Sequence, residues 1–417
     1  MAVGLSLGVD AVGAQSQIRL GVLVSHPIQY YSPWFRHLSN IVDLDVYYAY
    51  KQNARGQSEA GFGVEFEWDI PLLEGYKHHF LRNVSKRPGL GSFWGCDTPE
   101  IAHKIRERAF DAFLCIGWNR KCYWQALLAC KKARVSTLMR GDSQLGQKRS
   151  LAKSWVKEVP YRLLLPRIDA HLYVGQRNKE YLIRYGVKQK QLFHCPHFVD
   201  NDYFANQADE SLRIKAVANI RKELGIDEAK FVVLFVGKFI TKKRPRDVIE
   251  AIRRTMHPNR PINAIFVGSG PLELECKHAA KELPNIHFVG FQNQSALPAY
   301  YCAADALILP SDGDETWGLV VNEALACGTP CIISDACGCA ADMLGTGSPN
   351  LIYSCGDVSA LSDALASMAS TPPERRRSMR EASQRFAAKF SIENATDGSV
   401  NAISAVTGKR MTHHAAV

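Results

Sequence analysis

The chain of 417 residues contains no long uncharged apolar run. No stretch reaches the roughly 18 to 20 residues that a membrane-spanning helix requires, so the sequence predicts no membrane span. A secretory signal peptide is not indicated either, because the weakly apolar start of the chain has no basic residues and includes Asp10. We expect residues 1–17 to form a loose leader before the first strand.

The spacing typical of zinc sites is also missing, although the chain has 12 cysteines. Four of them cluster in the second half, but no C-x-x-C pair or partner histidine accompanies them. Most of the cysteines lie inside apolar runs, which is typical of reduced thiols in the core of a cytoplasmic protein. We therefore expect no zinc site and no structural disulfides.

Repeats, low-complexity segments and runs of interleaved aromatic and basic residues are absent, so nothing indicates nucleic-acid binding. The charge is uneven. Residues 1–200 hold 28 Lys and Arg against 17 Asp and Glu, a balance of +11, whereas residues 201–417 hold 23 against 24, a balance of −1. A basic first half suggests an acidic partner, such as an anionic membrane surface or a lipid-linked diphosphate. A solubilising cationic surface would explain the same imbalance.

What is present is a regular alternation of short apolar, β-branched runs with amphipathic stretches, the pattern of doubly wound parallel sheets. At this length, with 46% hydrophobic and 22% charged residues, two domains are expected. The candidate strands of the first half are 18–24, 44–50, 112–116, 136–139, 171–174 and 192–195. Those of the second half are 231–236, 263–267, 286–289, 306–309, 331–333 and 351–353.

Two series of strands imply two sheets, and a charged, helix-compatible stretch at 207–230 separates them. We therefore predict an α/β chain with a first domain at 1–204 and a second at 205–390. Residues 391–417 are expected to hold a last helix, at about 391–406, and a frayed tail.

One segment combines two carboxylates with a predicted helix start. Glu315 and Glu323 lie eight positions apart, after a short buried strand and an acidic turn. We predict a helix at about 317–327, because Gly328 is suited to a left-handed position at its end and Pro330 follows. A helix N-terminus offers unpaired N–H groups that suit a pyrophosphate, and Gly318 has no side chain to block it. Two solvated acids on a surface helix would be the ordinary explanation of this spacing alone.

The complete string is more specific than the spacing. The whole segment consists of the strand, the acidic turn, E-[TS]-x-G-L, N-E-A-x-A-x-G-x-P and the next strand. It resembles the donor-binding signature of retaining glycosyltransferase family 4. That family has the GT-B fold, in which two Rossmann-like domains face a central cleft. The resemblance covers about residues 18–405 and is strongest at 231–345. It implies hexosyl transfer from a nucleoside-diphosphate sugar, with no metal or other cofactor, and a last helix that crosses back onto the first domain.

The resemblance also assigns roles within the second half. Glu315 would orient the transferred sugar, and Glu323 would accept hydrogen bonds from the ribose diol. Lys238 and Lys243, after strand 231–236, would neutralise the donor diphosphate and the charge that grows on it during transfer. Alone, the two lysines could equally be a solvated basic loop. The remaining predicted donor-binding residues are Gly237, Gly268, Gly270, Val289, Gly290, Thr316, Trp317, Gly318 and Leu319.

The first half matches the family less closely. After strand 18–24 many members carry a glycine pair, whereas this chain has an aromatic loop in which His26 is either a site residue or a satisfied histidine near the core. After strand 136–139 many members carry a histidine, whereas this chain has Arg140 and Asp142. We predict that these two lie in the cleft as catalytic residues, with a structural ion pair as the alternative. His197 is expected to be a hinge residue.

The implied protein is a cytoplasmic enzyme, with the inner face of a membrane as an option for peripheral contact, that takes a glycan or lipid-linked acceptor of cell-envelope or exopolysaccharide biosynthesis. Two alternatives stay open. One is a catalytically idle GT-B module that binds a sugar nucleotide or a partner, and the other is a GT-B sugar-nucleotide 2-epimerase. The sequence does not specify the nucleotide base, the sugar, the acceptor or the oligomeric state.

Overall fold

The computed structural model describes residues 17–53, 56, 63–146, 151–207, 210–227, 229–255, 262–409 and 411, and only the backbone at 151–157, 207, 210–212 and 216. The predicted leader, apart from Gln17, and most of the predicted tail lie outside these residues. Within them, no helix is long and apolar enough to cross a membrane.

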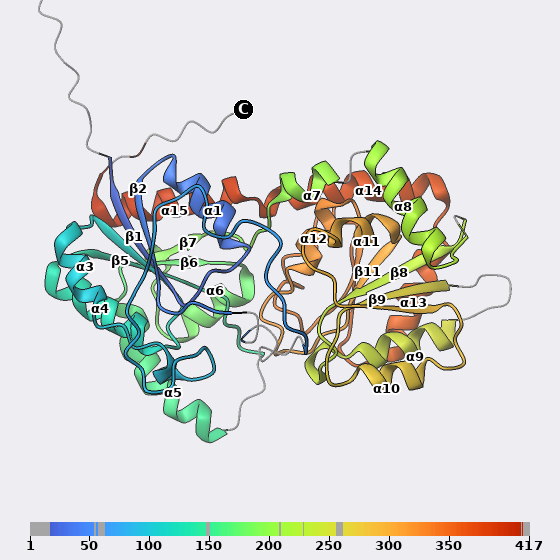
Figure 1. Ribbon diagram of the computed structural model, residues 1–417, viewed down its shortest axis with the longest axis horizontal. Coiled ribbons are helices and arrows are strands. Elements are labelled where there is room, and N and C mark those ends of the chain that lie inside the picture. The colour runs from blue at the N-terminus through green and yellow to red at the C-terminus, as the bar shows by residue number, and fades with distance from the viewer. Residues whose placement is uncertain are drawn as a thin grey trace, which may run out of the picture.

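The described strands form two parallel sheets in separate lobes (Figure 1). The first has the order β3-β2-β1-β4-β5-β6-β7. Its strands are β1 (Arg19–Val24), β2 (Asp43–Tyr48), β3 (His78–Phe80), β4 (Ala112–Ile116), β5 (Ser136–Gly141), β6 (Ala170–Tyr173) and β7 (Leu192–His194). The predicted α/β fold with two parallel sheets is confirmed.

The second sheet has the order β10-β9-β8-β11-β12-β13. All six residues of β8 are buried, which explains its continuous apolar sequence, since both faces of a parallel sheet are covered by helices. The strands are β8 (Phe231–Val236), β9 (Ile262–Val267), β10 (Ile286–Gly290), β11 (Ala306–Leu309), β12 (Cys331–Ser334) and β13 (Leu351–Tyr353).

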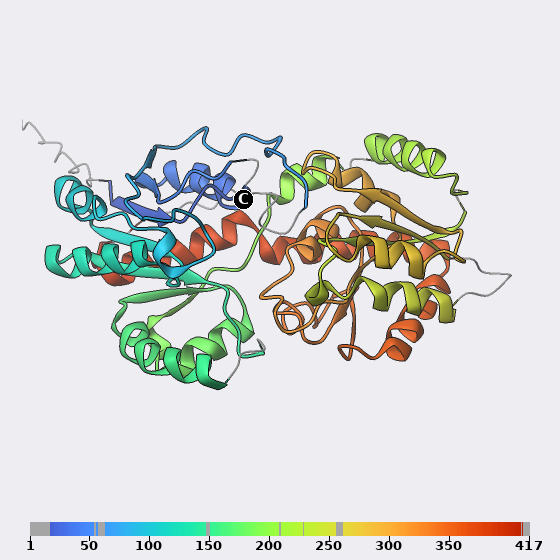
Figure 2. The same ribbon diagram turned by 60° about the horizontal axis from the view of Figure 1, so that its bottom comes forward.

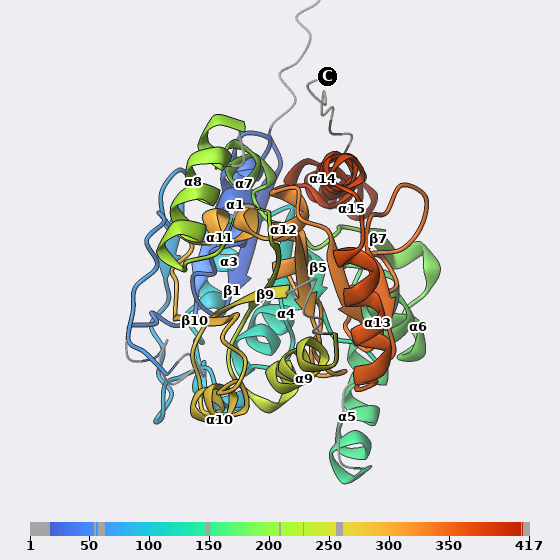
Figure 3. The same ribbon diagram turned by 90° about the vertical axis from the view of Figure 1, so that its right-hand side faces the viewer.

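Helices cover both faces of each sheet, and each face has its own buried apolar cluster. Figure 3 shows the second domain from its outer side, with α9 and α13 next to one another, as their packing requires. The described helices of the first domain are α1 (Tyr31–Ser39), α3 (Ile101–Arg108), α4 (Lys121–Ala133), α5 (Leu151–Leu164) and α6 (Gln176–Arg184). Those that follow are α7 (Asn201–Gln207), α8 (Glu210–Glu223), α9 (Pro245–Thr255), α10 (Glu273–Ala279), α11 (Leu297–Ala303), α12 (Val320–Ala326), α13 (Val358–Ala369), α14 (Pro373–Ala387) and α15 (Ile392–Thr407).

The last helix returns to the first sheet. After α14 on the second domain, α15 packs against β5, β6, β7 and α1 of the first domain (Figures 1 and 2). The approach to β7 is close: a Cβ atom at Gly398 would lie 1.8 Å from the carbonyl oxygen of His194. The chain therefore crosses between the two domains twice, once before α7 and once before α15.

Two local predictions were wrong. The edge strand β3 was missed, because a short run of two histidines and a phenylalanine has no apolar pattern. The helix expected from residue 317 begins at Val320. Gly318 has a positive φ of +105°, which is incompatible with a right-handed α-helix, so the helix cannot include this residue.

Candidate active site

The predicted donor-binding segments of the second domain meet at the carboxyl ends of β8, β9, β10 and β11, where open α/β sheets bind ligands. Close backbone packing requires glycine in this region. A Cβ atom at Gly268, where φ is +133°, would lie 2.0 Å from the carbonyl oxygen of Gly237. A Cβ atom at Gly270 would lie 2.8 Å from the carbonyl oxygen of Phe239. The glycines thus let the loops after β8 and β9 touch.

A buried ion pair lies beside these glycines. The ammonium nitrogen of Lys243 is 2.5 Å from Oε2 of Glu315, and that of Lys242 is 3.9 Å from the same oxygen. Burial alone would raise the pKa of Glu315, but Lys243 and Lys242 outweigh it and hold the pKa below its ordinary value. Glu315 is therefore a charged carboxylate at neutral pH, and the structure brings it together with Lys243 as the sequence suggested.

Lys238 belongs to the same group of charges. Burial, and then repulsion from Lys243 and Lys242, lower its pKa to about 8, while Glu315 partly opposes the shift. Two ammonium groups thus lie within 4 Å of the Glu315 carboxylate, and a third, that of Lys238, interacts electrostatically with all three groups. Such a site gains from a bound anion, because an anion would relieve the repulsion among the lysines.

The first domain holds the loop that carries Glu315. The buried side chain of Gln144 donates from Nε2 to the carbonyl oxygens of Gly313, at 3.0 Å, and Glu315, at 2.8 Å. Thr316 donates from its hydroxyl to Oδ2 of Asp142, at 2.7 Å. The carboxylate of Asp142 therefore takes part in a hydrogen bond between the domains, next to Glu315 in the sequence of the loop.

Glu323, which was expected to accept hydrogen bonds from a ribose, is already hydrogen-bonded to protein side chains. The residue is only 1% exposed, and both of its carboxylate oxygens already accept hydrogen bonds. Tyr301 donates to Oε2 at 2.5 Å, and Tyr30 of the first domain donates to Oε1 at 3.1 Å. Burial raises the pKa of Glu323 to about 7, although both tyrosine hydroxyls act in the opposite direction.

Trp317 does not present its side chain to the site. Its ring is 3% exposed, packs against His197 and Phe390, and donates from Nε1 to Asn322 at 2.9 Å. Leu319 precedes α12 as its N-cap residue. The segment 317–319 is therefore an irregular turn fixed by its tryptophan, rather than the first turn of a helix.

Arg140 was predicted to lie in the cleft, and that prediction is wrong. The strand β5 continues through residue 141, which turns the Arg140 side chain into the core, where it is 0% exposed. It donates to the carbonyl oxygens of Cys195 at 2.6 Å and Pro196 at 2.9 Å, and lies over the rings of Trp34 and Phe198. Arg140 therefore stabilises the segment that follows β7. The alternative prediction was an ion pair between Arg140 and Asp142, and the described contacts of Arg140 include no such pair.

Burial lowers the pKa of both histidines singled out in the sequence, His26 and His197. Nδ1 of His26 is 2.9 Å from the hydroxyl of Ser25, and burial, with a smaller effect of Arg120, lowers the His26 pKa to about 4. His197 is buried, which lowers its pKa as well, and its carbonyl oxygen accepts a hydrogen bond from Asn322 at 3.0 Å. Both are neutral at pH 7. His197 thus joins the segment between the domains to α12.

The predicted donor-binding residues Val289 and Gly290 lie next to a contact from the first domain. Gly290, with φ +74°, ends β10, and open space surrounds the position of its missing side chain. Val289 is partly buried against the second-domain core. Just beyond, the ring of Phe291 packs against that of Phe66 of the first domain, with centroids 4.4 Å apart and the ring planes tilted by 39°.

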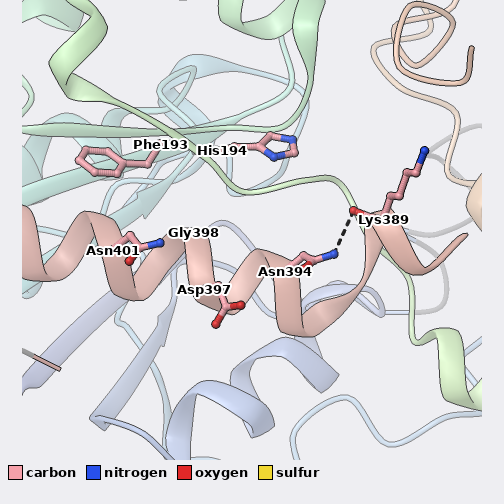
Figure 4. A pocket seen from close by; sticks show the side chains of 7 residues that line it. All are labelled: Phe193, His194, Lys389, Asn394, Asp397, Gly398 and Asn401. Carbon is pink, nitrogen blue, oxygen red and sulfur yellow. Dashed lines mark hydrogen bonds between the residues drawn. The ribbon is translucent and has the colours of Figure 1, made fainter. Parts of the chain in front are cut away.

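One hollow lies away from the glutamate and lysine side chains described above. This groove, of about 430 Å³, lies between β7 and α15, and Figure 4 shows Asn394, Asp397 and Asn401 of the helix beside it, with Lys389 just before the helix. None of its lining residues belongs to the segments described above. Within the described part of the chain, no group of three or more His, Cys, Asp or Glu side chains could hold a metal ion.

The architecture matches solved glycosyltransferases over nearly its whole length. A glycosyltransferase from Rickettsia africae superposes with a TM-score of 0.72, at 14% identity, over 94% of this chain and 99% of that one. HepE from Anabaena, solved in complex with UDP, superposes with a TM-score of 0.69, at 16% identity, over 93% of this chain and 100% of that one. The chain has the GT-B fold.

Sequence similarity is concentrated in the second half. Residues 217–386 match the family model "Glycosyl transferases group 1". A 2-deoxystreptamine N-acetyl-D-glucosaminyltransferase from Streptomyces fradiae is 34% identical over 37% of this chain and 38% of its own length. A D-inositol 3-phosphate glycosyltransferase from Gordonia bronchialis is 30% identical over 44% of this chain and 42% of its own length. The matches thus span well under half of these relatives.

Sequence reasoning missed several residues of the site. Tyr30 lies in the aromatic loop after β1, and Tyr301 and Gln144 occupy positions with no motif of their own. Only Lys242 carried a signal, since it adjoins Lys243 in the sequence. The others are contacts between segments distant in the chain, which no local pattern reveals.

Proposed function

We propose that the protein is a glycosyltransferase that moves a hexosyl group from a nucleoside-diphosphate sugar to an acceptor, with retention of configuration. The observation that carries the proposal is the pair of Lys243 and Glu315, with Lys238 beside it, at the strand ends of a GT-B second domain. A donor diphosphate would take the positive charge of the lysines, and the bound sugar would lie near the carboxylate.

In this proposal the lysines act on the leaving group. Negative charge accumulates on the diphosphate as the glycosidic bond breaks, and Lys238 and Lys243 stabilise it more in the transition state than in the bound donor. Glu315 orients the sugar. The departing phosphate accepts the proton of the attacking acceptor hydroxyl, so no protein nucleophile is needed. We expect no metal requirement, since the lysines supply the positive charge.

The test uses purified protein and a panel of UDP, GDP and ADP sugars. At least one donor is expected to raise the melting temperature and to be hydrolysed slowly without acceptor, with excess EDTA present. The matched control is Glu315→Gln, which should bind the same donor but hydrolyse it far more slowly. Failure of every donor to bind would contradict the proposal, and activity that needs added magnesium or manganese would contradict its metal-free form.

A catalytically idle binding module is the second candidate. The contact of Tyr30 with Glu323 favours it, because the predicted ribose acceptor is already engaged. The same panel separates the two functions: an idle module would bind a sugar nucleotide but neither hydrolyse nor transfer it under any condition tested.

For the acceptor we propose a glycan or lipid-linked intermediate of cell-envelope or exopolysaccharide biosynthesis, reached at the cytoplasmic face of a membrane. The support is the excess positive charge of residues 1–200. Transfer of labelled sugar from the identified donor to membrane extracts, separated into lipid and soluble fractions, tests this acceptor class.

A further inference from the structure

The first domain reaches into the second at Glu323. Tyr30 lies between β1 and α1, yet its ring packs against the apolar cluster of the second domain. Its hydroxyl donates to Oε1 of Glu323 at 3.1 Å. The loop after β1 is thereby joined to a buried charged group of the other domain.

The geometry leaves neither carboxylate oxygen open to an incoming ligand. Tyr301, which belongs to the second domain itself, donates to the other oxygen, Oε2, at 2.5 Å. Glu323 is 1% exposed, so solvent does not reach the carboxylate in this arrangement. A ribose diol that bonds to Oε1 would meet the Tyr30 hydroxyl, which lies 3.1 Å from that oxygen.

A second contact closes the same end of the site. Segment 63–69 of the first domain extends to the second domain, as Figures 1 and 2 both show in blue. Besides the contact between the rings of Phe66 and Phe291, the side-chain amide of Asn293 donates to the carbonyl oxygen of Glu67 at 2.7 Å. The amide of Ser295 donates to the carboxylate of Asp69 at 3.3 Å. In the described arrangement the first domain therefore contacts the second domain just beyond the end of β10.

We propose that Tyr30 holds the place of the donor ribose. Its hydroxyl substitutes for a ribose hydroxyl on Glu323, and a nucleoside diphosphate binds by taking over this hydrogen bond while Tyr30 withdraws with its loop. Tyr301 keeps its bond in both states. The inference rests on the proposed function. It assigns to Tyr30 a role in lowering donor affinity, because the Tyr30 hydroxyl competes with the donor for Glu323.

An internal competitor lowers the apparent affinity for the ligand, because only the fraction of molecules without the Tyr30 contact can bind. Removing the hydroxyl while retaining the ring removes the competition. We expect Tyr30→Phe to bind UDP at least about threefold more tightly than the wild type. Tyr301→Phe, the matched control on the same carboxylate, should not bind UDP more tightly.

The experiment is calorimetric titration of the full chain at pH 8.5 with UDP and with 2′,3′-dideoxy-UDP. Tighter binding of UDP to Tyr30→Phe, without a comparable gain for the dideoxy analogue, is the expected result. Equal or weaker UDP binding by Tyr30→Phe would overturn the inference. An equal gain for both ligands would overturn it as well, because Tyr30 would then block the entrance rather than replace the ribose.

The outcome separates this inference from the proposed function. If the wild type binds UDP and transfers a sugar but Tyr30→Phe has the same affinity, only the role of Tyr30 falls. If neither protein binds UDP, GDP or ADP, the proposed function falls and the inference falls with it. Circular dichroism melting of both tyrosine variants confirms that the proteins compared are folded.

Discussion

Lys243 and Glu315 form a direct ion pair, with 2.5 Å between the ammonium nitrogen and Oε2, and their side chains are only 13% and 12% exposed. Removing one partner of such a pair leaves an uncompensated buried charge, which costs about 3–5 kcal/mol, whereas removing both costs much less. The pair therefore couples the stability of the site to its chemistry.

The first prediction separates the two roles. Glu315→Gln should lower kcat by about a hundredfold with little change in donor Kd, because the carboxylate acts on the reacting sugar. Lys243→Met should weaken donor binding about tenfold through loss of a charged contact to phosphate. It should also lower the melting temperature, and the double variant should regain part of that loss. Independent, additive effects of the two substitutions on stability would contradict the coupling.

The second prediction concerns pH and Glu323. Because its pKa is about 7 in the folded protein and near the ordinary value of 4.5 in the unfolded chain, the folded state binds more protons between these values. The contribution of Glu323 to stability is therefore full below about pH 4.5 and is lost as the pH rises to about 7. Glu323→Gln does not titrate at this position. The melting temperature of the variant, relative to that of the wild type, should therefore rise between pH 5 and pH 8. A constant difference across this range would show that the carboxyl group has an ordinary pKa.

Separately, Glu323→Ala should weaken donor binding.

The third prediction concerns Lys238, whose pKa of about 8 places its titration just above neutrality. Only the protonated amine attracts a diphosphate. UDP affinity should therefore fall as the pH rises through this value, by about tenfold once the charge is lost. In Lys238→Arg the guanidinium stays charged, and the fall should be much smaller. Calorimetry of both proteins at pH 7 and pH 9.5 makes the comparison, and parallel losses would assign the pH dependence to another group.

The strands of the second domain were predictable because both faces of a parallel sheet are buried, so each strand carries a continuous apolar run such as 231–236. The Glu315 and Lys243 positions were predictable because each lies in the loop after such a strand, within a string of residues that resembles a family signature. Arg140 was misplaced for the opposite reason: it adjoins a strand end in sequence, but β5 extends by two residues and carries the side chain into the core. Tyr30 had no signal, since its partner lies 293 residues away.

The fourth prediction follows from the buried position of Arg140. Arg140→Lys keeps a charge but cannot donate to the carbonyl oxygens of both Cys195 and Pro196 in the same geometry. Its melting temperature should fall substantially, by the equivalent of about 3 kcal/mol, because a buried charge loses hydrogen bonds. The folded fraction should bind the donor with unchanged Kd. A large loss of donor affinity at full stability would return Arg140 to the donor site.

The last prediction concerns the charge of the first domain. Several basic residues are exposed there, among them Lys86 and Arg87 before the turn at 93–95, and Lys131 and Lys132 in the last turn of α4. Each well-placed Lys or Arg contributes about 1 kcal/mol to binding an anionic bilayer, and the attraction fades within a Debye length. We expect co-sedimentation with anionic vesicles at low salt, little with neutral vesicles, and a loss of about tenfold or more in affinity for Lys131→Ala/Lys132→Ala. The matched control is Lys222→Ala/Lys281→Ala, which removes the same charge from exposed positions of the second domain. If both double variants lose affinity equally, the overall charge rather than a first-domain surface attracts the protein to the bilayer. If the wild type does not bind anionic vesicles at low salt, a soluble acceptor becomes the better hypothesis.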